Sequence, residues 1–127
     1  AELVIEARAA GYRLALATNP IFPRVANIER LSWAGIDPGS FDLIPGVEGF
    51  STCKPQEGFF RECAAAVGAD PRRCLMVGND EEQDLPASSA GMKTFLVRPY
   101  LISRGRATEK PWREGDLDAL GKLLGLW

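Results

Sequence analysis

The sequence predicts an α/β protein with three layers, in which helices cover both faces of a mostly parallel sheet. Four short apolar segments are typical of buried strands, and they lie at residues 13–17, 41–44, 74–77 and 94–97. Helical patterns separate these segments, so strands and helices alternate along the chain. Such alternation favours a parallel sheet with right-handed crossovers. We therefore expect a Rossmann-like α/β/α sandwich in a single domain of residues 1–127.

The predicted helices rest on apolar residues spaced three or four positions apart. Glycines close the helices, because a glycine readily adopts the left-handed conformation that ends a helix. They stand at Gly11, Gly35, Gly68 and Gly91. The apolar positions are Leu3, Val4, Ala7 and Ala10 in the first helix, Val25, Ile28 and Leu31 in the second, Phe59, Phe60, Cys63 and Val67 in the third, and Leu117, Leu120 and Leu124 in the last.

Composition excludes several classes of function. The 127 residues include 15 basic and 17 acidic side chains, so no excess of positive charge is available for bulk binding of nucleic acid. No apolar run approaches the roughly 18 residues that a membrane span needs, so we expect no membrane partner. There is no histidine, which excludes Ser-His and Cys-His catalysis within this chain. Three cysteines without a C-x-x-C spacing indicate reduced thiols and a cytoplasmic protein.

Two further features concern surfaces. Residues 98–115 carry five basic side chains and two prolines, and we interpret this segment as a solvated connection. The alternative is a patch for an anionic substrate or a partner. The tryptophans at positions 33, 112 and 127 are candidates for the contact surface of a homodimer. For Trp33, we favour partial burial on its helix.

Polar residues follow the first two predicted strands, at the edge where parallel sheets bind ligands. Thr18 and Asn19 come directly after the first strand, and Pro20 suits a helix start. A hydroxyl and helix N–H groups at this place suit a phosphate oxygen. After the second strand, Lys54 precedes Pro55 and can pair with a phosphate or with a catalytic carboxylate. Turn capping by Thr18 and Asn19, and an ordinary surface lysine, are the alternatives.

An acidic cluster follows the third predicted strand. Four carboxylates lie within residues 80–84, and their mutual repulsion at a helix start favours a bound hard cation. Mg²⁺ takes one or two carboxylates together with water and phosphate oxygens. Asp80 and Asp84 are four residues apart and can face the same side, which leaves Glu81 and Glu82 pointing to solvent. The alternative is an acidic cluster that only caps the helix.

Together these motifs resemble the haloacid dehalogenase-like (HAD) hydrolase superfamily. Thr18, Lys54-Pro55 and Gly78-Asn79-Asp80-x-x-x-Asp84 are similar to its motifs II, III and IV, in the same order. The resemblance implies a Mg²⁺-dependent phosphatase that acts on a small phosphorylated metabolite through an aspartyl-phosphate.

The same resemblance assigns a role to each matched residue. Thr18, assisted by Asn19, binds the phosphoryl group, and Lys54 stabilises charge on the nucleophile and the phosphate. Asp80 and Asp84 would hold Mg²⁺, directly or through water. An aspartate usually occupies the position of Asn79, so whether Asn79 or Asp80 meets the metal first is open, and we favour Asp80 because it is charged.

The motif that supplies the attacking aspartate, D-x-D-x-[TV], is absent from the chain, and neither Asp37 nor Asp42 stands at the end of a strand. The opening helix has no capping residue. We therefore interpret the chain as the C-terminal portion of a HAD core, with the nucleophile strand and cap lying upstream. In the family that strand lies between the strands expected at 13–17 and 74–77. Without it, we expect no stable isolated monomer with the family's sheet order: upstream residues, direct pairing of these strands or a second chain must fill the gap.

Three interpretations of function compete. The first is the phosphatase, with residues 1–127 inactive on their own. The second is a non-catalytic HAD-like domain that binds phosphate or a partner, and the missing nucleophile and Asn79 favour it. The third, a receiver domain like that of response regulators, fails because its acidic cluster belongs near the chain start. A dehalogenase needs no metal and leaves the acidic cluster unexplained.

Overall fold

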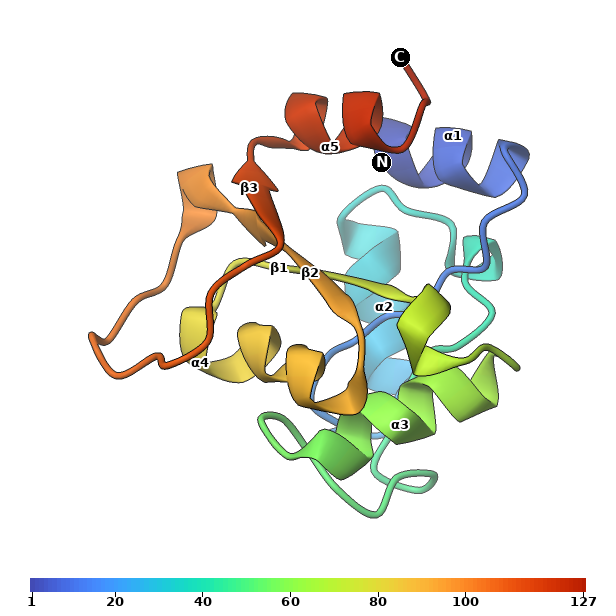
Figure 1. Cartoon of the computed structure of the whole chain (residues 1–127). Coiled ribbons are helices and arrows are strands. Elements are labelled where there is room, and N and C mark those ends of the chain that lie inside the picture. The colour runs from blue at the N-terminus through green and yellow to red at the C-terminus, as the bar shows by residue number, and fades with distance from the viewer.

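A computed structural model describes all of residues 1–127 and contains a three-stranded parallel sheet (Figure 1). The strands are β1 (Leu75–Gly78), β2 (Lys93–Val97) and β3 (Arg113–Gly115), in the order β1-β2-β3. Leu75 of β1 is in register with Lys93 of β2, and Phe95 of β2 with Arg113 of β3. The predicted α/β class with a parallel sheet is therefore confirmed.

The strands predicted at 74–77 and 94–97 form as β1, which is shifted by one residue, and as β2, which begins one residue earlier than predicted. β3 was missed, because it lies inside the segment interpreted as a solvated connection. Its three residues, Arg-Glu-Gly, carry no apolar pattern, and they form an edge strand through main-chain pairing with β2. Part of the 98–115 segment is thus a structural element.

The segments predicted as strands at 13–17 and 41–44 do not form extended strands. They meet in a single parallel bridge, Ala15 with Leu43. Its hydrogen bonds run from the Leu16 N–H to the Leu43 oxygen at 2.9 Å and from the Leu43 N–H to the Leu14 oxygen at 3.3 Å. β1 pairs only with β2. Direct pairing of 13–17 with β1, one of the three expected solutions, is therefore wrong for this structure, and the chain does not complete a five-stranded sheet.

All the predicted helices form, although one is interrupted. They are α1 (Glu2–Ala9), α2 (Arg24–Trp33), α3 (Glu57–Ala66), α4 (Glu81–Asp84) and α5 (Leu117–Leu123). The helix expected between β1 and β2 is split into α4 and a 3-10 turn, η3 (Leu85–Ala90), with Pro86 near its start. The other 3-10 turns are η1 (Pro38–Ser40), η2 (Pro71–Arg73) and η4 (Arg98–Tyr100). No helix is both long and apolar enough to cross a membrane.

The apolar core is divided into two clusters. The larger lies between α3, β1 and η3, below the sheet in Figure 1, and is built around Phe59, Phe60 and Met76. The smaller joins β2 to α5 through Phe95, Val97 and Leu120, and Leu3 of α1 packs against it. The partial burial expected for Trp33 is wrong: this side chain on α2 is 79% exposed.

Candidate functional site

Lys54 lies at the centre of the polar contacts between the loops. Its Nζ is 2.7 Å from Asp84 Oδ1, and only 13% of the Lys54 side chain and 6% of the Asp84 side chain are exposed. The Lys54 backbone N–H donates to Asn19 Oδ1 at 2.8 Å. One residue therefore joins the loop after segment 13–17 to the end of α4. The sequence predicted a phosphate or a catalytic carboxylate as the partner of this lysine, whereas its partner in the structure is Asp84, which was expected as a metal ligand.

Asn19 acts in this structure as a bridge between two loops, because its side-chain oxygen is taken by the Lys54 N–H. Thr18 lies beside it and lines the same cavity as Lys54. The helix start expected at Pro20 is wrong. α2 begins at Arg24 with Pro23 in the cap position, so the N–H groups of its first turn do not directly follow Thr18 and Asn19.

Besides pairing with Lys54, Asp84 holds the turn after β1. Its Oδ2 accepts hydrogen bonds from the backbone N–H groups of Asn79 and Asp80, both at 3.1 Å. Gly78 permits this arrangement, because a Cβ atom at that position would collide with the Asp84 carboxylate. Both Asp84 oxygens are therefore engaged by donors from the chain itself.

Asp80 caps α4. Its Oδ1 accepts from the N–H groups of Glu82 at 3.0 Å and Gln83 at 3.1 Å, which is typical of an N-cap aspartate. Its carboxylate also faces Arg104, whose Nη1 lies 3.0 Å from Oδ1 and 3.1 Å from Oδ2. Oδ2 has no other hydrogen-bond partner. The capping alternative thus describes part of what Asp80 does.

Glu81 and Glu82 do not point freely to solvent, contrary to expectation. Glu81 accepts a hydrogen bond from the Ser103 hydroxyl at 2.8 Å. The Glu82 side chain is 18% exposed and lies 3.9 Å from Arg104 and 3.5 Å from Arg106. The basic segment after β2 therefore neutralises the acidic cluster internally, an arrangement that the opposite charges of the two segments indicate in retrospect.

The oxygen atoms near Asp80 suit a cation that needs few protein ligands. Asn79 donates its amide Nδ2 to the Tyr100 oxygen at 2.7 Å, which leaves its Oδ1 without a hydrogen bond. Asn79 Oδ1 and Asp80 Oδ2 are hard oxygen donors, the type that Mg²⁺ prefers. Nowhere do three or more carboxylate or thiol side chains group into a metal cage. This set fits Mg²⁺ bound by one or two protein ligands and otherwise by water and phosphate.

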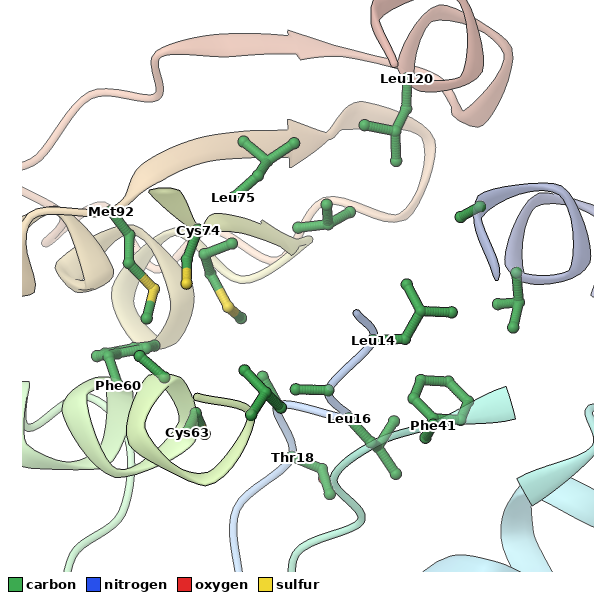
Figure 2. A pocket seen from close by; sticks show the side chains of 18 of the residues that line it. Leu14, Leu16, Thr18, Phe41, Phe60, Cys63, Cys74, Leu75, Met92 and Leu120 are labelled. Carbon is green, nitrogen blue, oxygen red and sulfur yellow. The ribbon is translucent and has the colours of Figure 1, made fainter. Parts of the chain in front are cut away.

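A cavity of about 420 Å³ separates segment 14–18 from β1 (Figure 2). Apolar residues form 19 of its 21 lining positions, and the polar side chains among them are Thr18 and Lys54. Ala15 and Ala17 line it, and neither uses its backbone N–H or C=O in a backbone hydrogen bond. The cavity thus combines apolar walls with unpaired main-chain groups along one side.

The environment also shifts the pKa of a thiol in the cavity wall. Burial, with smaller contributions from Glu62 and Cys74 and an opposing one from Lys54, raises the pKa of Cys63 to about 12. Burial likewise raises the pKa of Cys74, with a smaller contribution from Asp70. Both thiols are therefore protonated at neutral pH and are not nucleophiles there.

Comparisons with known proteins agree with the fold and the motifs. A family model described as HAD-hydrolase-like matches residues 52–114. The glyceraldehyde 3-phosphate phosphatase of Methanothermobacter thermautotrophicus is 33% identical over 105 residues, which are 81% of this chain and 45% of that protein. The phosphoserine phosphatase of Thermus thermophilus is 34% identical over 113 residues, 88% of this chain and 42% of that protein.

A solved structure extends the likeness to three dimensions. A HAD phosphatase from Thermococcus onnurineus superposes with a TM-score of 0.78 at 25% identity, covering 98% of this chain and 55% of its own. The chain spans about half the length of the curated relatives it matches. On these matches, together with the ordered motifs, the chain belongs to the haloacid dehalogenase-like superfamily and matches it as part of a HAD domain.

Proposed function

We propose that this chain forms part of a Mg²⁺-dependent phosphatase that acts on a small phosphorylated metabolite. The observation that carries the proposal is the buried Lys54–Asp84 pair, which Asn19 ties to the loop that holds Thr18. A buried ammonium with one carboxylate partner still has two N–H donors for a phosphate oxygen. The curated relatives that match the chain are named as phosphatases, which supports this chemistry.

In this proposal the residues of the chain have distinct tasks. The Thr18 hydroxyl and the Lys54 ammonium donate hydrogen bonds to the phosphoryl oxygens, and Lys54 also stabilises negative charge as the transfer proceeds. Asp84 pairs with the Lys54 ammonium and holds it in place. Asn79 Oδ1 and Asp80 Oδ2 would hold Mg²⁺, which supplies shielding of the phosphate charge when bound. Asp84 would support the metal site through water or through the turn it fixes.

We further propose that the cavity between segment 14–18 and β1 receives an extended apolar strand that carries the attacking aspartate. A strand buried on both faces is a continuous apolar run, which suits these walls, and its main chain would pair with the free groups of Ala15 and Ala17. Thr18 and Lys54 lie on the same cavity. The aspartate carboxylate would attack phosphorus and displace the leaving group, and water would then hydrolyse the aspartyl-phosphate to release inorganic phosphate.

Asp37 and Asp42, which do not stand at the end of a strand, form contacts outside the candidate site. Asp37 caps η1 by accepting from the Gly39 N–H at 2.9 Å. Asp42 accepts from the Leu14 N–H at 2.8 Å and pairs with Arg8 at 2.6 Å, and this backbone hydrogen bond and the arginine hold the pKa of Asp42 below its usual value. Both carboxylates serve structural roles, which supports a nucleophile outside residues 1–127.

The experiment is a phosphatase assay of the full-length gene product with Mg²⁺ and a panel of small phosphate monoesters. Lys54→Ala should lower kcat/KM by roughly 10²–10³-fold, as expected when a charge-stabilising donor is removed. Lys122→Ala is the matched control, because Lys122 also pairs with an aspartate, Asp118, at 2.9 Å but on the exposed face of α5. Full activity in Lys54→Ala would contradict the proposal.

A non-catalytic domain that binds phosphate is the second candidate, and the neutral amide of Asn79 is the observation that favours it. Inorganic phosphate binding that depends on Lys54, without turnover of any phosphate ester by the full-length gene product, would support this candidate. The three cysteines are free in the structure, which supports a reducing, cytoplasmic location for either function.

A further inference from the structure

The chain segment after β2 folds back over the acidic cluster. Residues 100–106, here called the arm, run beside residues 79–82, here called the acidic turn. The Ile102 N–H donates to the Asn79 oxygen at 2.7 Å, and the Glu81 N–H donates to the Ile102 oxygen at 3.1 Å. Asp80 and Ile102 form a parallel bridge. Main-chain bonds in both directions therefore fix the register of the arm against the acidic turn.

This register places a guanidinium on Asp80. Arg104 Nη1 contacts both carboxylate oxygens, at 3.0 and 3.1 Å, and it is the only side chain that does so. The Asp80 side chain is 12% exposed, whereas Arg104 is 42% exposed. The carboxylate is thus nearly buried, whereas the arginine is partly exposed and its side chain has hydrogen bonds to Asp80 alone.

Glu82 offers Arg104 a second acceptor. Its Oε2 already lies 3.9 Å from Arg104 Nη1, while its Oε1 is buried without a hydrogen-bond partner. Arg106 lies 3.5 Å from the same Oε2. A guanidinium that leaves Asp80 would therefore find a carboxylate acceptor at Glu82 Oε2, and a donor that reached Oε1 would relieve the cost of a buried oxygen without a partner.

We propose that Arg104 is an internal cation that competes with the divalent metal for Asp80 and so sets the affinity of the metal site. This inference rests on the proposed Mg²⁺ site. Asp80 Oδ2 is the oxygen that the helix N–H groups leave free, and Arg104 is its partner. Two cations at one carboxylate repel each other, so metal binding requires Arg104 to move, and Glu82 receives it.

The test is binding of Mn²⁺ to the full-length gene product, followed by loss of the electron paramagnetic resonance signal of free Mn²⁺. Arg104→Gln should bind Mn²⁺ about fivefold more tightly than the wild type, since a partly exposed ion pair no longer has to break. Arg104→Lys keeps the charge and should stay within about twofold of the wild type. Arg106→Gln is the matched control from the same arm, because it contacts Glu82 and not Asp80, and it should not tighten binding.

A double variant separates direct competition from a general change in charge. Asp80→Asn combined with Arg104→Gln should bind Mn²⁺ no more tightly than Asp80→Asn alone, because the competed carboxylate is gone. Unchanged or weaker binding by Arg104→Gln, or equal tightening by Arg106→Gln, would overturn the inference while leaving the metal site in place. Absence of Mn²⁺ binding by every protein, the wild type included, would overturn the proposed metal site and the inference with it.

Discussion

Lys54 and Asp84, thirty residues apart, form an ion pair of 2.7 Å between two nearly buried side chains. Asp84 also accepts two backbone N–H groups, so its three contacts join the loop before α3 to the turn after β1. Removing one partner of a buried pair leaves the other charge without compensation. This pair is therefore central both to the stability of the fold and to the site.

We expect Lys54→Met to lower the free energy of unfolding by about 3 kcal/mol, because it leaves the Asp84 carboxylate buried and unpaired. The measurement is urea denaturation of the full-length gene product. Lys122→Met serves as the control, since the Lys122–Asp118 pair is largely exposed and its loss should not change stability measurably. Equal effects of the two substitutions would show that burial does not govern the Lys54 pair.

Gly78→Ala should disrupt the turn that holds Asp84. The added Cβ would occupy the space of the Asp84 carboxylate, so either the backbone or the ion pair must shift. We expect a loss of about 1–3 kcal/mol in the free energy of unfolding, together with loss of phosphatase activity. Gly49→Ala is the control, because a Cβ there meets no atom within 4 Å. Unaltered stability and activity in Gly78→Ala would contradict the geometry of the turn.

Asp80→Ala should cost about 1 kcal/mol of stability, because α4 loses the side chain that caps two of its N–H groups. Asp80→Asn keeps an oxygen that accepts these hydrogen bonds but removes the charge. It should therefore retain most of the stability while weakening Mn²⁺ binding. Thermal unfolding and Mn²⁺ titration of the two variants distinguish capping from metal binding. Equal Mn²⁺ affinity of Asp80→Asn and the wild type would assign Asp80 to capping alone.

The raised pKa of Cys63 predicts that the contribution of this thiol to the free energy of unfolding is lost at alkaline pH. Its pKa is raised in the folded protein from 9.0 to about 12, chiefly by burial, so between these values the unfolded chain loses a proton that the folded protein keeps. The stabilising contribution of the thiol is complete below pH 9 and declines as pH rises toward 12. The difference in stability between the wild type and Cys63→Ala should shrink over this range in urea denaturation. A constant difference would contradict the shifted pKa.

Much of the fold follows from local sequence patterns. β1 and β2 are apolar runs, and the glycines at 11, 35, 68 and 91 end helical segments with positive φ. β3 escaped prediction because its pairing with β2 depends on the main chain and leaves no apolar signature. The segments at 13–17 and 41–44 have the composition of buried strands, yet each has a neighbour on one side only. Apolar composition indicates that a segment is buried, whereas an extended strand also requires a neighbouring strand with which to pair.

The sequence predicted the candidate site, like the fold, only in part. Sequence order placed Thr18, Lys54 and Asp84 at one edge of the sheet, since parallel strands bring their following loops together. It did not reveal that the Asn19 side-chain oxygen accepts a hydrogen bond from the Lys54 N–H, or that Arg104 contacts Asp80. Those contacts depend on how loops of irregular conformation fold back. Opposite charges in residues 80–84 and 104–106 were the available signal for the second contact.

We propose that Thr18, Lys54 and the acidic turn share one phosphate and metal site. The most direct measurement is a crystal structure of the full-length gene product with Mg²⁺ and vanadate bound. We expect vanadate oxygens about 3 Å from both Thr18 Oγ1 and Lys54 Nζ, and Mg²⁺ in contact with Asn79 Oδ1 or Asp80 Oδ2. Vanadate bound away from Thr18 and Lys54, or Mg²⁺ bound without Asn79 and Asp80, would contradict it.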